Sequence, residues 1–196
     1  MKRFLLTAVT MALSKMIFAQ QTNLKDFNLQ KKAINQKGFI VLGSWSAANI
    51  IYGTIAAQKA GGSNKYYHQM NAMWNAITLG LVSFGYISGR KNKTLNFSES
   101  LKQQSTVEKL FLFNAGLDVA YIAGGFYLVE KSKTSIEHAD RNKGFGKSII
   151  LQGSVLLAFD AIMFGIHQHH GKQLYKLAEK VEVASTADGL GVIVKL

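Results

Sequence analysis

The chain is 196 residues long, which is the length of a single domain, and no shift in composition marks a second one. It has no cysteine and no proline, which excludes disulfides, thiol nucleophiles and thiolate metal sites, and no helix is broken by a missing backbone donor. The formal net charge is +12, but the lysines are spread over all the connecting segments without a nucleic-acid-binding motif, so we expect them to meet lipid headgroups and not nucleic acid.

The first segment, residues 1–19, has the features of a secretory signal peptide. A positive start and an apolar stretch over residues 4–13 precede a polar-to-small stretch that ends at Ala19. We predict cleavage after Ala19. An uncleaved signal anchor is the alternative, because Ile17 is larger than the residue preferred three positions before the cut. Residues 20–37, a polar and amphipathic lead-in, then lie on the translocated side.

Four apolar stretches follow, and each approaches the roughly 20 residues that a helix needs to cross the hydrocarbon core of a bilayer. Strands of a membrane barrel would be about half as long and would alternate strictly between apolar and polar residues, unlike these stretches. The second stretch is the most polar, so three spans are the alternative, but pairing of neighbouring helices into hairpins favours four. The predicted spans are residues 38–57, 70–89, 110–129 and 148–167.

The sequence therefore predicts an all-α fold, a polytopic transmembrane four-helix bundle over residues 38–170, behind the signal peptide. Small residues recur at every fourth position on three of its helices, a spacing that lets helix backbones approach closely in lipid. These positions are Gly53, Ala57 and Gly61; Gly85 and Gly89; and Gly116, Ala120 and Gly124.

The last segment, residues 171–196, is predicted to begin as an amphipathic helix at the membrane surface, with apolar residues on one face and lysines on another. Asp188-Gly189 is a hairpin-type turn pair between residues 183–186 and 190–194, which have the composition of strands. A lone two-stranded hairpin is marginal in water, so a frayed end is the alternative.

One strongly polar residue lies near the centre of each predicted span: Asn49, Asn75, Asp118 and Asp160. If Asn49 matches Asp118 and Asn75 matches Asp160, the bundle consists of two similar helical hairpins. The helical period extends the four residues into polar stripes: Trp45, Asn49 and Tyr52; Asn71, Asn75 and Thr78; Asn114, Asp118 and Tyr121; and Gln152, Gly153, Asp160 and His167.

These polar stripes are expected to face the interior of the bundle, because a carboxylate in the bilayer centre costs at least about 2.5 kcal/mol. No Lys or Arg lies inside any predicted span. If Asp118 and Asp160 meet, low dielectric and mutual repulsion favour one shared proton over two full charges. The layer is either a set of interhelical hydrogen bonds that fix helix register, which we prefer, or a proton- or cation-linked site.

The histidines His167, His169 and His170 form the one cluster that suggests a metal. A helix places His167 and His170 on one face. Three imidazoles at one helix end leave tetrahedral zinc or copper coordination incomplete, and no carboxylate is adjacent in sequence. We therefore prefer interfacial imidazoles placed favourably against the helix dipole, and expect no cofactor. The other two, His68 and His138, are predicted on the opposite side of the membrane.

The stretch Tyr66-Tyr67-His68-Gln69-Met70-Asn71-Ala72-Met73-Trp74-Asn75, which follows a Gly-Ser-Trp helix at Gly43–Trp45, resembles an uncharacterised family of small inner-membrane proteins from Bacteroidota. The resemblance covers roughly residues 35–170, and the Phe-Ala-Gln-Gln end of the signal is typical of the same group. It implies an inner-membrane location and four spans. It implies no activity and no catalytic residue.

The sequence has no catalytic Ser-His-Asp order, no phosphate-cradling glycine loop and no dinucleotide fingerprint, so we favour a protein that is not an enzyme. The leading hypothesis is a structural or partner-binding envelope protein, with lipid, other membrane proteins or further copies of the chain as partners. The alternative is a small transporter or channel subunit that uses Asp118 and Asp160. The third is a membrane metal-binding protein that uses the histidine cluster.

Orientation rests on two opposing signals. Export of the N-terminus places both the mature N-terminus and the C-terminus on the periplasmic side. The segments that then lie outside carry more Lys and Arg than the loops at 58–69 and 130–147, which opposes the positive-inside tendency. We give precedence to the signal peptide because it acts first during insertion.

Overall fold

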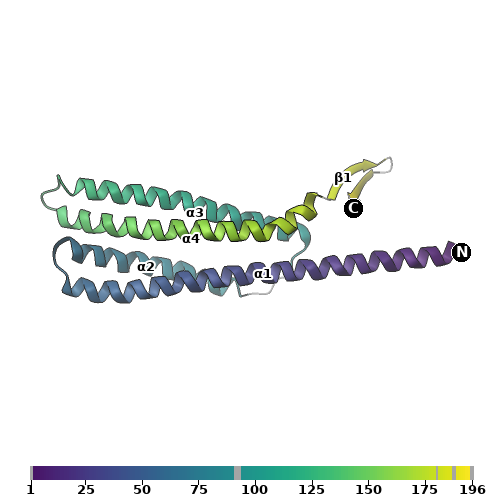
Figure 1. The fold of residues 1–196 in the computed structure, drawn as a ribbon, viewed down its shortest axis with the longest axis horizontal. Coiled ribbons are helices and arrows are strands. Elements are labelled where there is room, and N and C mark those ends of the chain that lie inside the picture. The colour runs from purple at the N-terminus through teal and green to yellow at the C-terminus, as the bar shows by residue number, and fades with distance from the viewer. Residues whose placement is uncertain (1, 91–93, 180, 187–188, 195–196) are drawn as a thin grey trace.

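The computed structural model describes residues 2–90, 94–179, 181–186 and 189–194, and these form four helices and a small β-hairpin (Figure 1). The elements are α1 (Lys2–Lys59), α2 (Gly62–Ser88), α3 (Phe97–Lys131), α4 (Ala139–Glu179), β1 (Val181–Thr186) and β2 (Gly189–Val194). The strands pair antiparallel, with Val181 opposite Val194. The predicted four-helix fold is confirmed. The tail forms the predicted hairpin and not the frayed end, although Asp188 of its turn lies outside the described residues.

The helices are longer than the predicted spans. Helix α1 runs without a break through the predicted signal segment from Lys2 onward and through the lead-in at 20–37. Helix α4 continues past residue 170 to Glu179, so the first part of the predicted tail belongs to it. No proline interrupts either run. At about 1.5 Å per residue, α3 and α4 exceed the roughly 30 Å of a hydrocarbon core, so the bundle extends beyond a bilayer.

Local signals fix the helix ends. Helix α3 begins with a capping box, in which the Glu99 N–H donates to Asn96 Oδ1 over 2.9 Å and the Asn96 N–H donates to Glu99 Oε2 over 3.0 Å. The turn from α1 to α2 contains Gly62, whose φ of 54° lies in the left-handed region that glycine adopts most easily. The turn at Gly62 lets α2 pack back against α1.

The four helices form two hairpins, α1–α2 and α3–α4, which pack on each other mainly through α2 and α4 (Figure 1). Both hairpin loops lie at one end of the bundle, and the two ends of the chain lie toward the other. Helix α3 approaches α4 closely at Gly125 and Gly146. A Cβ atom at Gly146 would lie 2.6 Å from the carbonyl oxygen of Gly125. Glycine at these positions therefore lets the two backbones touch.

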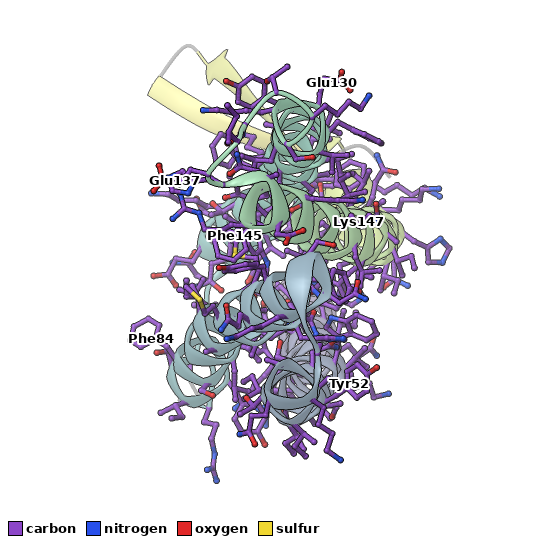
Figure 2. The ribbon with its side chains drawn as sticks, turned by 90° about the vertical axis from the view of Figure 1, so that its left-hand side faces the viewer. Tyr52, Phe84, Glu130, Glu137, Phe145 and Lys147 are labelled. Atoms are coloured by element: carbon purple, nitrogen blue, oxygen red, sulfur yellow. The ribbon has the colours of Figure 1, made fainter. Side chains whose placement is uncertain are left out.

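The polarity of the bundle is inverted relative to a water-soluble protein. The buried apolar residues are Phe27, Val82, Met163 and Leu174, whereas the buried polar or charged ones are Lys31, Ser46, Asn71, Asn75, Ser100, Gln104, Asp118, Ser148, Gln152, Asp160 and His167. Large apolar side chains project outward instead, and Figure 2 shows Tyr52 and Phe84 pointing away from the bundle. A continuous apolar exterior of this kind is suited to lipid.

Three of the described helices, Leu24–Lys59, Phe97–Lys131 and Ala139–Lys176, are long and apolar enough to cross a membrane. These contain the first, third and fourth predicted spans. Helix α2 does not meet the same criterion within the described residues, which agrees with the polar character of its sequence. Membrane-spanning capacity is therefore present in three helices, and a span at α2 stays a prediction.

Candidate functional site

A central polar network joins three helices in the middle of the bundle. It consists of Trp45 and Asn49 on α1, Asn71 and Asn75 on α2, and Gln152 on α4. Asn71 Nδ2 donates to Asn49 Oδ1 over 2.9 Å, and Trp45 Nε1 donates to Gln152 Oε1 over 3.3 Å. Gln152 Nε2 donates to Asn71 Oδ1. Asn71 is thus bonded to both neighbouring helices.

The spacing of these residues in the sequence produces the network. Trp45 and Asn49 are four residues apart, as are Asn71 and Asn75, so each pair lies on one helix face. Asn49 Nδ2 donates to the Trp45 carbonyl over 2.9 Å, and Asn75 Nδ2 donates to the Asn71 carbonyl over 2.8 Å. Gln152 is only 1% exposed. The amide groups therefore find partners inside the protein, as polar groups in lipid require.

The two aspartates form a separate pair between α3 and α4. Asp118 is 3% exposed and Asp160 is 6% exposed, and their carboxyl groups lie within hydrogen-bonding reach of each other. Within the described parts of the chain, Asp118 Oδ2 meets no hydrogen-bond donor, and Asn75 Oδ1 also has none. The buried centre of the bundle therefore has more acceptors than donors.

The structure buries three of the four predicted polar-layer residues and part-buries the fourth, Asn49. It divides them into two groups. Asn49 and Asn75 belong to the central polar network, while Asp118 and Asp160 form the acid pair. Tyr52 was expected on the same polar face as Asn49, but it is 62% exposed. A full helical turn takes 3.6 residues, so Tyr52, three residues after Asn49, is rotated away from it.

A second group of polar side chains, the terminal polar cluster, lies nearer the chain ends, where α1, α3 and α4 meet. Its members are Asn28, Lys31, Asn35, Ser100, Gln103, Gln104, Glu108, His167, His170 and Tyr175. On the α1 side, Asn28 Nδ2 donates to Ser100 Oγ over 2.8 Å, and Lys31 Nζ donates to Gln103 Oε1 over 3.1 Å. Lys31 is 5% exposed. Sequence analysis missed this burial, since a lysine in a polar lead-in is typical of a solvated surface.

The α3–α4 side of the terminal polar cluster is centred on Glu108. Gln104 Nε2 donates to Glu108 Oε1 over 2.8 Å and to the His167 carbonyl over 2.7 Å. The Tyr175 hydroxyl donates to Glu108 Oε2 over 2.8 Å. These bonds continue the contact of α3 with α4 beyond residues 110–129 and 148–167. These bonds were not predicted, because they form where α3 and α4 extend past their apolar stretches.

The three clustered histidines are separated by their contacts. His167 is fully buried, and its Nε2 lies 2.9 Å from Asn35 Oδ1. His170 Nε2 lies 3.1 Å from the Phe27 carbonyl, and its ring stacks on Phe27. Because both partners are acceptors, both Nε2 atoms donate and cannot also bind a metal. His169 is exposed. The described residues contain no group of three or more His, Asp or Glu side chains that could hold a metal ion.

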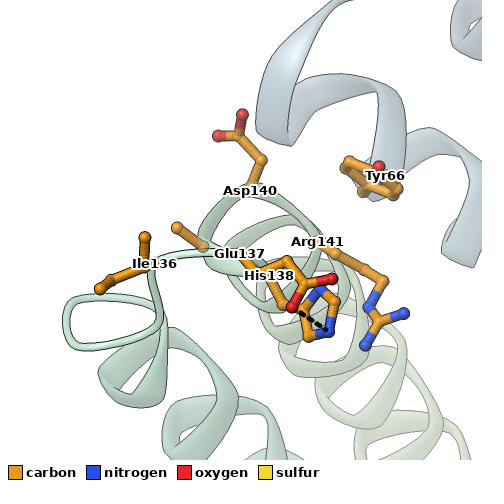
Figure 3. Close-up of a pocket in the computed structure, with 7 residues that line it drawn as sticks. Tyr66, Ile136, Glu137, His138, Asp140 and Arg141 are labelled. Carbon is orange, nitrogen blue, oxygen red and sulfur yellow. Dashed lines mark ion pairs between the residues drawn. The ribbon is translucent and has the colours of Figure 1, made fainter.

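A shallow pocket of about 370 Å³ lies at the opposite, hairpin-loop end of the bundle. Figure 3 shows its lining, which includes Tyr66, Glu137, His138 and Arg141. The His138 ring lies 3.9 Å from the Glu137 carboxylate, and both side chains are well exposed. Side chains this open to solvent offer no enclosed reaction space, so we assign no site there.

A family model described as a family of unknown function, DUF6992, matches residues 41–161. The chain belongs to this family. The DUF6992 segment contains Asn49, Asn75, Asp118 and Asp160, and it ends before the histidine cluster begins. It also lies inside the region over which the sequence resembles an uncharacterised family. No curated protein and no solved structure matches the chain. Membership in DUF6992 therefore brings no activity with it.

Proposed function

We propose that this DUF6992 protein is an integral protein of the inner membrane with a structural or partner-binding role. The observation that carries the proposal is the central polar network inside an apolar exterior. Lipid removes the hydrophobic driving force between helices, so packing and interhelical hydrogen bonds must hold them together. Asn71 bonds to side chains of α1 and α4 at once, and this arrangement fixes the rotation and register of α2.

Four spans are favoured by the packing of α2. This helix lies alongside α1 and α4, both of which are apolar enough to cross a membrane. The outer face of α2 is apolar, with Ile77, Leu81 and Phe84 each more than two-thirds exposed, at 68%, 69% and 73%. A helix that packs between two spans and presents such a face belongs in the same bilayer. Four antiparallel spans then place both chain ends on one side, which we propose is the periplasm.

The partner-binding part of the proposal concerns α3. Ideal Cβ positions at Gly116 and Gly124 have no atom of another described residue within 4 Å, and the intervening Ala120 is exposed. At the glycines of the α3–α4 contact, by comparison, the backbone of the facing helix occupies the space that a Cβ atom would take. The open face of α3 thus has the small-residue spacing that close helix contact uses, and it is free to meet another copy or another membrane protein.

The structural role is tested by comparing two substitutions at one position. Asp160→Asn keeps a group that donates and accepts in the same place, so we expect unchanged membrane levels and thermal stability. Asp160→Leu leaves Asp118 buried without its partner, and we expect an unfolding midpoint several degrees lower, since such losses cost about 1–3 kcal/mol. Equal stability of the two variants would contradict a structural role for the acid pair. The matched exposed control is Asp140→Leu.

A further inference from the structure

The acid pair in the middle of the bundle has a property that hydrogen bonding between helices does not explain. Asp118 and Asp160 come from different helices, are almost fully buried, and lie within hydrogen-bonding reach. A carboxylate accepts hydrogen bonds but cannot donate one, so two carboxyl groups bond only when one of them carries a proton. We propose that Asp118 and Asp160 form a proton-binding site that holds one exchangeable proton between them.

No positive charge nearby offsets the two carboxylates. On α1 the residue at this depth is Gly38, which lies against Phe159 and Met163. The adjacent Lys37 is exposed, and residues 38–58 include no charged residue. On α2 the facing groups are Asn75 and Thr78, which do not titrate. On α3 the nearest titratable group is Tyr121, whose ring packs against Trp74 on α2. On α4 it is His167, two turns or about 10 Å from Asp160. Among the described residues no Lys or Arg side chain lies between the two carboxyl groups, so a proton is the positive charge that fits there.

The shortage of donors around the pair supports this assignment. Helices α2 and α4 run in the same direction, with Gly144 beside Tyr67 and Gln152 beside Asn71. One more turn along α2 brings Asn75 to a level between Gln152 and Asp160. Asn75 is 1% exposed. Among the described residues, its Oδ1 and Asp118 Oδ2 both lack a donor. A shared proton makes one carboxyl of the pair a donor in this donor-poor centre.

A divalent cation fits this site less well than a proton. Calcium takes about six to eight oxygen ligands, and magnesium demands a near-ideal octahedron. Two carboxyl groups and one amide oxygen offer fewer, and no group of three metal-binding side chains occurs in the part of the chain that the structure describes. The site is also independent of the proposed structural role, because amides in place of both carboxyls would keep the helices bonded.

The proposal is tested by infrared spectroscopy of the purified full chain in detergent at neutral pH. A protonated carboxyl in apolar surroundings gives a carbonyl band that shifts in D₂O, whereas exposed aspartates are ionised at this pH. We expect the band in the wild type and in the exposed control Asp140→Asn, and its loss in the double variant Asp118→Asn, Asp160→Asn. Absence of the band from folded wild-type protein, or its persistence in the double variant, would overturn the proposal.

Two further arms keep the test decisive if the double variant does not fold. An apolar carbodiimide, which reacts with protonated carboxyls, should label Asp118 or Asp160 of the wild type in mass spectrometry and spare Asp140. Labelling confined to exposed carboxyls would contradict the proposal. The infrared band should also be the same in sodium chloride and in choline chloride. Its loss in sodium chloride alone would show that a metal cation, not a proton, occupies the pair.

Discussion

Gln152 on α4 donates a hydrogen bond to Asn71 on α2, and this bond links the two helical hairpins of the bundle. The same Gln152 accepts from Trp45 on α1, and Asn71 donates to Asn49 on α1. One glutamine and one asparagine therefore tie three helices together where no charged side chain is present. In lipid, such bonds contribute about 0.6 kcal/mol each on average, but leaving their buried groups unpaired costs more.

Replacement of Asn71 by leucine should be the most damaging single change in the central polar network. It removes the partner of Gln152 Nε2 and of Asn49 Oδ1 at once. We expect a loss of about 2 kcal/mol or more in the free energy of unfolding, measured by denaturant titration in detergent. The control Asn64→Leu, at an exposed position on the same helix, should change it by less than about 0.5 kcal/mol. Similar losses in both variants would contradict this role.

The sequence predicted the fold class, because apolar length and helical period indicate long helices. A functional role for the polar layer of Asn49, Asn75, Asp118 and Asp160 stays a prediction. The sequence did not predict how that layer is divided. Periodicity places Asn75 and Asp160 on inward faces, but the partners of each depend on the rotation of neighbouring helices. The burial of Lys31 was missed for a related reason. It depends on α3 and α4 extending past their apolar stretches, and polar residues at helix ends are typical of solvated surfaces.

The glycines of the bundle differ in what surrounds them, and a matched pair of alanine substitutions tests this. Gly146→Ala would place a Cβ atom 2.6 Å from the Gly125 carbonyl oxygen, so the helices must separate. We expect a loss of about 1–3 kcal/mol in stability. Gly116→Ala meets open space among the described residues and should be neutral or stabilising by up to about 1 kcal/mol, because alanine favours helix. If Gly146→Ala and Gly116→Ala changed the unfolding midpoint equally, the close packing of α3 on α4 at Gly146 would be contradicted.

The hydrogen bond from Tyr175 to Glu108 tests whether α3 and α4 stay packed beyond the predicted spans. Tyr175→Phe removes the hydroxyl that donates to Glu108 Oε2 over 2.8 Å. A bond to a charged group is worth about 1.5–3 kcal/mol, so a measurable fall in stability is expected. The control Tyr127→Phe alters a hydroxyl on a residue that is 64% exposed and should have little effect. No difference between the two variants would mean that the helix ends separate in solution.

Purified protein should contain no stoichiometric zinc or copper. His167 and His170 both donate through Nε2 to oxygen atoms of α1, so neither ring presents that nitrogen to a metal. Elemental analysis after purification without chelators measures this directly. About one metal per chain in the wild type, lost in the His167→Ala, His170→Ala double variant, would restore the metal-binding hypothesis.

We propose that the helices cross a membrane with the hairpin loops on one side and the chain ends on the other. The absence of cysteine makes single-cysteine labelling clean. Ser98 lies exposed near the start of α3, and Ile136 is fully exposed in the α3–α4 loop. With a membrane-impermeant thiol reagent on spheroplasts, Ser98→Cys should be labelled at once and Ile136→Cys only after permeabilisation. Equal labelling of both before permeabilisation would contradict a membrane-spanning α3, and the reverse pattern would contradict the proposed orientation.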